Sequence, residues 1–225
     1  MVFAALVVAA SLAAAPPDGT YSYDLQQSGT SIGSATVTLK HADAGILIHE
    51  KQDIKLGSSS MNYVVDETLD PGSLAPRSYV ATYTKDGTPA VIRMALDSGG
   101  VRGSIDGVSG ISAVTLPTDT KANFIVELSL LSGYVALPAQ VSAAHVSKFA
   151  EVVPSQFIAV ENHVQQNMNP VRPSGVPAQD VPLSISSNVD YDIWYDPLNY
   201  TVHAVVVSTQ NVIFKLTKYS AEVKS

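Results

Sequence analysis

The sequence predicts an all-β protein: a long, curved antiparallel sheet, an open or half barrel of many short hairpin strands, with one packed helix. Short segments with apolar and polar residues in alternation recur from Thr20 onward, as strands with one buried face require. Turn signals such as DPGS, KDGT and DSGG separate these segments. Their spacing leaves no room for the helical crossovers of a parallel sheet, so the strands should form a meander.

The strands follow from the alternation, segment by segment. In SATVTLK, Ala35, Val37 and Leu39 share one face, opposite two threonines and a lysine. The same pattern predicts further strands, listed by residue number: 45–51, 61–69, 77–85, 89–97, 100–107, 110–116, 140–153, 156–166, 189–196, 201–207 and 211–219.

One segment breaks the alternation and predicts the helix, over residues 121–132. Asp119 or Thr120 can cap its N-terminus, and Phe124, Leu128 and Leu131 follow at helical spacing. We expect Gly133 and Pro138 to end it. Because apolar residues occur on most of its sides, this helix should pack against the sheet or inside it.

The composition excludes several classes of function. The chain has 225 residues, of which 46% are hydrophobic and 15% charged, so it can bury a large core. A net charge of −7 and the absence of any basic run argue against nucleic acid as a partner. With no cysteine there is no disulfide, thiolate metal site or cysteine nucleophile. No phosphate-binding loop or nucleophile elbow occurs, and we expect no cofactor.

The N-terminus indicates export. Residues 1–15, MVFAALVVAASLAAA, are apolar throughout and end in small residues, as a secretory signal does. They are shorter than the about 20 residues that span a bilayer. No second apolar stretch is long enough for a membrane helix, so the mature chain should lack a transmembrane segment. We therefore expect a periplasmic or envelope protein with a single β domain over residues 18–225.

Three carboxylates in the predicted strand 189–196, Asp190, Asp192 and Asp196, raise the question of catalysis. Asp190, Asp192 and Trp194 would share one face of this strand, and His203 lies on the returning strand. Glycoside hydrolysis uses two facing carboxylates, so Asp190 and Asp192, with His203, are the catalytic candidates. A solvated strand has the same pattern, with Trp194 as the outlier on the wet face, and we expect this simpler arrangement.

Metal binding has one candidate pair. Glu161 and His163 are two residues apart, so they would point to the same side of a strand. Two ligands do not make a site, and no other metal-binding spacing occurs. We expect surface residues here and no metal.

The tyrosines suggest a different kind of site. They alternate with aliphatic residues along the strands, and a tyrosine offers a dry ring with a polar tip. On the concave face of a curved sheet, such side chains can line a pocket for a lipid-like molecule. An ordinary core is the alternative. The ligand-binding candidates are Tyr63, Tyr79, Tyr83, Phe124, Leu128, Leu131, Tyr191 and Tyr195.

The overall layout resembles a family of uncharacterised bacterial periplasmic proteins known only as a domain of unknown function. The resemblance is carried by GTYSYDLQQSGTSIGSATVTL near the start and IWYDPLNYTVHAVVV with VIFKLTKY at the end. More distantly, the chain is similar to lipoprotein carriers of the localisation-factor type, whose half-barrel holds acyl chains under a helical cover. Neither resemblance implies catalytic residues. We expect a non-enzymatic protein that binds a hydrophobic ligand. The alternatives are an envelope glycan hydrolase and a module that pairs with a partner through an exposed sheet edge.

Overall fold

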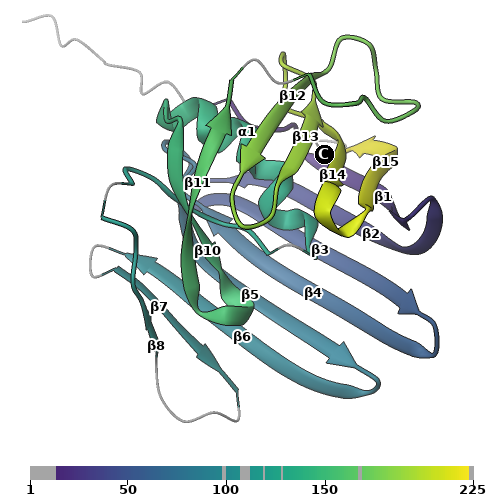
Figure 1. Cartoon of the computed structure of the whole chain (residues 1–225). Helices are drawn as coiled ribbons and strands as arrows, with labels where there is room; N and C mark the ends of the chain where they lie inside the picture. The colour runs from purple at the N-terminus through teal and green to yellow at the C-terminus, as the bar shows by residue number, and fades with distance from the viewer. Residues whose placement is uncertain are drawn as a thin grey trace, which may run out of the picture.

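The computed structural model describes residues 14–97, 100–106, 112–118, 120–127, 129–166 and 169–222. These residues form one sheet of fifteen strands, not closed into a barrel, and one α-helix (Figure 1). The predicted all-β fold with a single packed helix is confirmed. Of the predicted export signal, only Ala14 and Ala15 belong to the described residues.

The elements are β1 (Gly19–Gln27), β2 (Thr30–Ala42), β3 (Gly45–Leu56), β4 (Ser59–Leu69), β5 (Pro76–Lys85), β6 (Thr88–Asp97), β7 (Gly100–Ile105), β8 (Ser112–Val114), β9 (Asn123–Ile125), α1 (Leu131–Ala144), β10 (Lys148–Val153), β11 (Ile158–Gln165), β12 (Val181–Ser186), β13 (Tyr191–Tyr195), β14 (Val202–Val207) and β15 (Val212–Ala221), with short 3₁₀ turns η1 (Pro154–Gln156) and η2 (Ser208–Gln210).

The sheet is two meanders joined in the middle. Strands β1 to β8 follow one another to one edge, and β15 back to β9 lead to the other, with β1 paired to β15 at the centre. Every pairing among the described strands is antiparallel except that of β9 with β10. The edge strands β8 and β9 are three residues each. Edges this short offer few free backbone groups to a partner strand.

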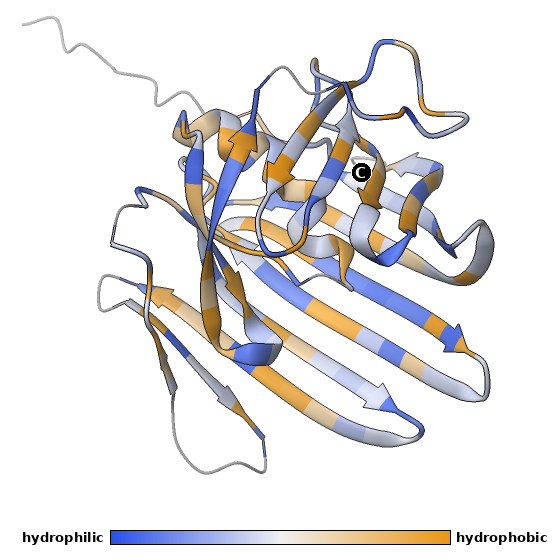
Figure 2. Ribbon diagram, in the orientation of Figure 1, coloured by the Kyte–Doolittle hydropathy of each residue, from blue (hydrophilic) through white to orange (hydrophobic). Residues whose placement is uncertain are grey.

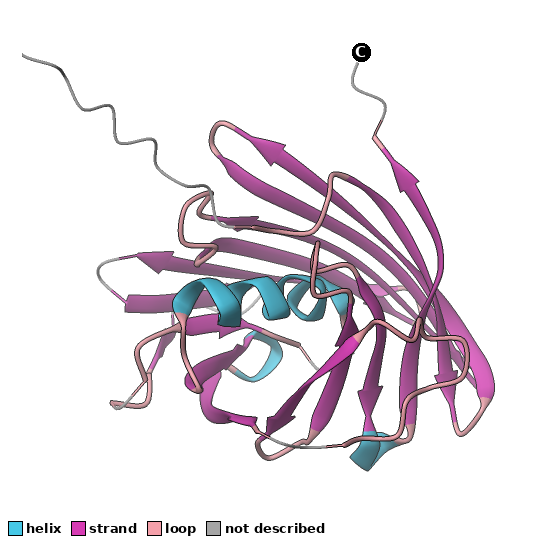
Figure 3. Cartoon of the chain, turned by 90° about the horizontal axis from the view of Figure 1, so that it is seen from above, coloured by secondary structure: helices cyan, strands magenta, loops and turns pink. Residues whose placement is uncertain are grey.

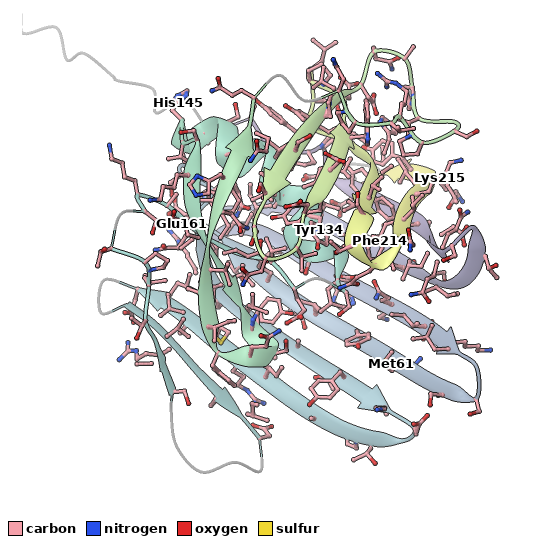
Figure 4. The ribbon with its side chains drawn as sticks, in the orientation of Figure 1. Met61, Tyr134, His145, Glu161, Phe214 and Lys215 are labelled. Carbon is pink, nitrogen blue, oxygen red and sulfur yellow. The ribbon has the colours of Figure 1, made fainter. Side chains whose placement is uncertain are left out.

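The core lies between the concave face of the sheet and helix α1. Seen from above, the strands curve around the helix (Figure 3), and the ribbon alternates between hydrophobic and hydrophilic bands along many of the strands (Figure 2). On β1, Tyr21, Tyr23 and Leu25 are buried and alternate with half-exposed residues. On the helix, Tyr134 packs against Phe214 of β15, with ring centroids 6.2 Å apart (Figure 4).

The predicted position of the helix is wrong. Residues 123–125 form β9, and α1 begins only at Leu131 and runs to Ala144, through part of the predicted strand 140–153. The apolar residues of this segment wrongly suggested a helix because β9 is buried on both faces. A strand of this kind shows no alternation of apolar and polar residues. The helix is itself buried continuously from Leu131 to Val141, so it has no polar side and no helical periodicity either.

Gly133 and Pro138 lie inside the helix, where they were expected to end it. A Cβ on Gly133 would sit 2.4 Å from the carbonyl oxygen of Ile125, so only glycine lets the first turn press against β9. Pro138 has no backbone N–H group to donate within the helix. Burial of the whole helix in the sheet outweighs both local costs. The helix ends instead at His145, whose left-handed conformation (φ 50°) suits a C-terminal cap.

Trp194 is not an outlier on a wet face, and that expectation is corrected. Its exposed fraction is 4%, because the loop between β11 and β12 packs over the convex side of β13. Val176 from this loop, with Ala204 of β14, forms a small second core around the indole ring. The guanidinium of Arg172 lies 4.4 Å from the ring centroid. The proline-rich loop therefore acts as a cover for an apolar patch on the outer face of the sheet.

Candidate functional site

A cavity of about 300 Å³ lies on the concave side of β4, β5 and β6. Tyr63, Tyr79 and Tyr83 contribute its aromatic wall because alternate residues of neighbouring strands point to the same face. The segment just before helix α1 closes another side. Among the described residues, the lining consists of Tyr63, Tyr79, Ala81, Tyr83, Ile92, Glu127, Ser129, Leu130 and Ser155.

The aromatic wall is a mixture of buried and accessible rings. Tyr79 is fully buried, whereas Tyr63 and Tyr83 are half-buried and their ring centroids lie 6.4 Å apart. The hydroxyl group of Tyr63 donates to the sulfur of Met61 at 3.5 Å. The half-buried rings leave apolar surface available to a small molecule.

The start of helix α1 is held by a carboxylate from a distant strand. Glu50 on β3 is fully buried and accepts hydrogen bonds from the backbone N–H groups of Leu131 (3.0 Å) and Ser132 (2.7 Å). The helix has no side-chain N-cap of its own at Leu130, so Glu50 satisfies two of the free N–H groups and opposes the positive end of the helix dipole. Gln52, two residues along β3, donates to the carbonyl oxygen of Ser129.

A second carboxyl group, that of Glu67 on β4, is buried without a hydrogen-bond partner. It is 2% exposed, and neither of its oxygens has a hydrogen-bond partner among the described residues. It pairs in register with Tyr79 on one side and Ile48 on the other. Burial, and secondly the charge of Glu50, raise the pKa of Glu67 to about 8. Glu67 is therefore largely protonated at neutral pH.

Glu50 shows how burial and hydrogen bonding compete. Burial raises its pKa to about 7, although the N–H groups of Leu131 and Ser132 act in the opposite direction. Burial also raises the pKa of the Tyr79 phenol well above its usual value, and the charges of Glu127, Glu50 and Glu67 add to this effect. Tyr79 thus stays a neutral phenol, beside three carboxyl groups, at the base of the cavity.

Glu127 brings a carboxylate to the lining itself. Its Oε2 accepts a hydrogen bond from the backbone N–H of Ser155 in η1, at 3.0 Å. Its charge contributes to the raised pKa values of Tyr63 and Tyr79. Chemically, the cavity offers aromatic faces, hydroxyl groups and one carboxylate, which are groups that recognise a ligand by shape and charge.

Of the predicted ligand-binding residues, three meet at this cavity: Tyr63, Tyr79 and Tyr83. Phe124 lies in the main core, with its ring centroid 5.1 Å from that of Phe149. Leu131 is the buried first residue of α1. Leu128 lies outside the described residues.

The other two predicted tyrosines belong to different environments. Tyr191 is fully buried, donates to Glu151 Oε2 at 2.9 Å and packs edge-on against Tyr134. Burial raises the pKa of Glu151 to about 7, although the hydrogen bonds from Tyr191 and Asn162 oppose it. Tyr195 stacks on Tyr200, with ring centroids 5.9 Å apart.

The catalytic candidates are dispersed over the outer surface. Asp190 precedes β13 and accepts from the backbone N–H of Ser187, and Asp192 accepts from the hydroxyl of Ser184 on β12. His203 pairs with Asp180, with 2.7 Å between Nδ1 and Oδ2. None of the three lines the cavity.

The metal-ligand candidates do lie side by side, but a lysine joins them. His163 contacts Glu161 at 2.9 Å, and the ammonium of Lys148 contacts the other oxygen of Glu161 at 2.8 Å. Lys148 lowers the pKa of Glu161 and occupies the position of a cation. Figure 4 shows Glu161 at the surface of β11. Among the described residues, no group of three or more acidic or histidine side chains is placed to hold a metal ion.

The prediction from sequence missed Glu50, Glu67 and Glu127. A signal was present for the first two, because each occupies an apolar position of an alternating strand. Glu50 continues the series Ile46 and Ile48, and Glu67 lies between Val65 and Leu69. A charged residue in such a position is a candidate for a buried functional group.

The fold and the cavity define an open, curved β-sheet protein with a helix in its concavity. Comparison of the chain with protein-family models, with curated proteins and with solved structures finds no match. Within the described ranges, no helix combines the length and apolarity needed to cross a bilayer.

Proposed function

We propose that this protein is a non-enzymatic binding protein that holds a small hydrophobic molecule in the cavity over β4, β5 and β6. The observation that carries the proposal is the wall of Tyr63, Tyr79 and Tyr83 together with Ala81 and Ile92, which leaves apolar surface around an unfilled volume of about 300 Å³. Cavities of this size are at the lower end of those that hold small ligands.

The two alternatives have less support. A hydrolase needs its carboxylates in one cleft, and Asp190 and Asp192 instead bind neighbouring backbone and hydroxyl groups. An edge-pairing module needs a long free edge, and β8 and β9 have three residues each. The cavity therefore carries the proposal.

The proposed setting is the bacterial periplasm or cell envelope, and it rests on the apolar residues 1–15. The likeness to periplasmic domains of unknown function and to lipoprotein carriers is part of the same proposal. Cell fractionation and N-terminal sequencing of the mature chain test it. Recovery of uncleaved protein in the cytosol would contradict it.

The first experiment is native mass spectrometry of the protein purified from its own cells, followed by organic extraction. We expect a stoichiometric adduct that is released as a hydrophobic molecule. A clean protein mass, with no uptake of added octanol, would reject the proposal.

A pair of variants locates the binding site. Ala81→Leu places a larger side chain in the cavity lining and should reduce uptake by at least tenfold. Ala95→Leu makes the same change on the exposed convex face of neighbouring β6 and should leave uptake unchanged. Equal uptake by both variants would place the ligand elsewhere.

A further inference from the structure

The cavity has an electrostatic character that narrows the class of ligand, and this inference rests on the proposed function. We propose that the preferred ligand is a cationic amphiphile: a short apolar chain or ring that carries an amine or quaternary ammonium group. The apolar part would lie among Ala81, Ile92 and Leu130, and the cation would lie between the tyrosine rings and Glu127.

The sign of the charge in the cavity lining favours a cationic ligand. Among the described lining residues, Glu127 is the one ionisable side chain besides the tyrosines, and there is no lysine, arginine or histidine. The negative field in the cavity is therefore that of the Glu127 carboxylate, which also acts on the Tyr79 phenol. An anionic ligand, such as a fatty acid, would enter this field with no cation to pair with.

The aromatic wall favours a cation independently of the carboxylates. Tyr63 and Tyr83 present neighbouring rings, with centroids 6.4 Å apart, on the same face of the sheet. Cations are attracted to the faces of aromatic rings, and aromatic side chains beside an acidic group are a general means of binding an ammonium group. Aromatic rings beside a carboxylate favour a cation that retains some apolar surface over a small hydrated metal ion.

The polar and apolar residues of the lining lie at different sides of the cavity, as the two parts of an amphiphile require. Glu127 and Ser155 are at one side of the lining and are joined by the 3.0 Å hydrogen bond from the Ser155 N–H. The aliphatic residues Ala81 and Ile92 come from β5 and β6 and are buried. A cavity with a polar side and a dry side matches a molecule with a charged head and an apolar body.

Isothermal titration calorimetry with three probes that share one apolar chain tests the proposal: octylamine, octanol and octanoate, each below its aggregation concentration. We expect octylamine to bind at least tenfold more tightly than octanol, and octanoate to bind most weakly. Equal affinity for all three, or preference for octanoate, would overturn the inference but leave the proposed function intact. Binding of none of the three would reject the proposed function itself.

Two matched pairs of substitutions test which groups cause the preference for octylamine. Glu127→Gln should reduce octylamine affinity at least fivefold and leave octanol affinity unchanged, whereas Glu161→Gln removes the same charge from the surface of β11 and should change neither. Tyr83→Leu should weaken octylamine more than octanol, and Tyr83→Phe should retain the binding of both. Loss of octylamine affinity in Glu161→Gln equal to that in Glu127→Gln would show a general charge effect and overturn the proposal.

Discussion

Glu50 and Ser132 are 82 residues apart in the chain, and the Glu50 carboxylate accepts the hydrogen bond of the Ser132 backbone N–H at 2.7 Å. This contact ties the first turn of the only α-helix among the described residues to the concave face of β3. It also places the preceding segment, with Glu127 and Ser129, against the cavity. The position of the helix start and the shape of the candidate site are therefore linked.

Removal of this contact should destabilise the fold. Glu50→Leu leaves the N–H groups of Leu131 and Ser132 buried without an acceptor, and we expect the free energy of unfolding to fall by about 2–4 kcal/mol. Glu50→Gln keeps one acceptor oxygen and should cost less than half as much. Urea denaturation measures both, and an unchanged midpoint for Glu50→Leu would contradict the assigned role.

Stability should decrease as the pH rises. Glu50, Glu67 and Glu151 have pKa values of about 7, 8 and 7, above their ordinary value of 4.5. The folded state thus binds more protons than the unfolded state at intermediate pH, and this stabilisation is lost as the pH rises through the folded-state values. We therefore expect the free energy of unfolding to be lower near pH 8 than near pH 5. Denaturation curves that give an equal or greater free energy of unfolding at the higher pH would refute this prediction.

Glu67 should destabilise the folded state at alkaline pH. Glu67→Leu removes a buried group that has no partner and fills the same space with apolar atoms, so we expect a gain of about 1–3 kcal/mol near pH 8. Near pH 5 the carboxyl is already protonated, and the gain should be smaller. A variant that is less stable than the parent chain at both pH values would show that Glu67 has a partner of structural importance.

Gly133 should tolerate no side chain. The Cβ of Gly133→Ala would meet the Ile125 carbonyl oxygen at 2.4 Å, which forces the helix away from β9. We expect a loss of about 1–3 kcal/mol, despite the higher helix propensity of alanine. Gly72→Ala is the control, because its Cβ would be 3.5 Å from the nearest atom, in ordinary contact. Similar stabilities for the two variants would argue against the close approach of α1 and β9.

The cover over Trp194 can be monitored directly, because this is the only tryptophan in the sequence. Arg172→Ala removes the guanidinium from the indole face and its hydrogen bond to the Asp180 carbonyl (2.9 Å). We expect the fluorescence maximum to shift to longer wavelength and acrylamide quenching to increase. Val171→Ala, at an exposed neighbour, should change neither signal. An unaltered spectrum in Arg172→Ala would mean that the loop covers the ring without Arg172.

Part of the candidate site could be predicted from sequence. Tyr63, Tyr79 and Tyr83 lie on strands with clear alternation, so their shared face was readable, and the hairpin turns place β4 beside β5. Glu50 and Glu67 occupy apolar positions of the alternating strands, a signal that the prediction from sequence did not use. Nothing local indicated that Glu127 would join them, because its segment looks helical and instead follows the buried strand β9.

The sequence by itself determined the all-β class, most strand positions and which residues share a face, because alternation and turn chemistry act between near neighbours. Only the tertiary structure decided where the helix begins, that Gly133 and Pro138 lie within it, and that a loop buries Trp194. These outcomes depend on contacts between distant segments: the Glu50 carboxylate at the helix start, the Ile125 carbonyl beside Gly133, and Arg172 over the indole ring. Burial against a partner that is remote in the chain outweighs local propensity, and such a partner is not visible in a window of sequence.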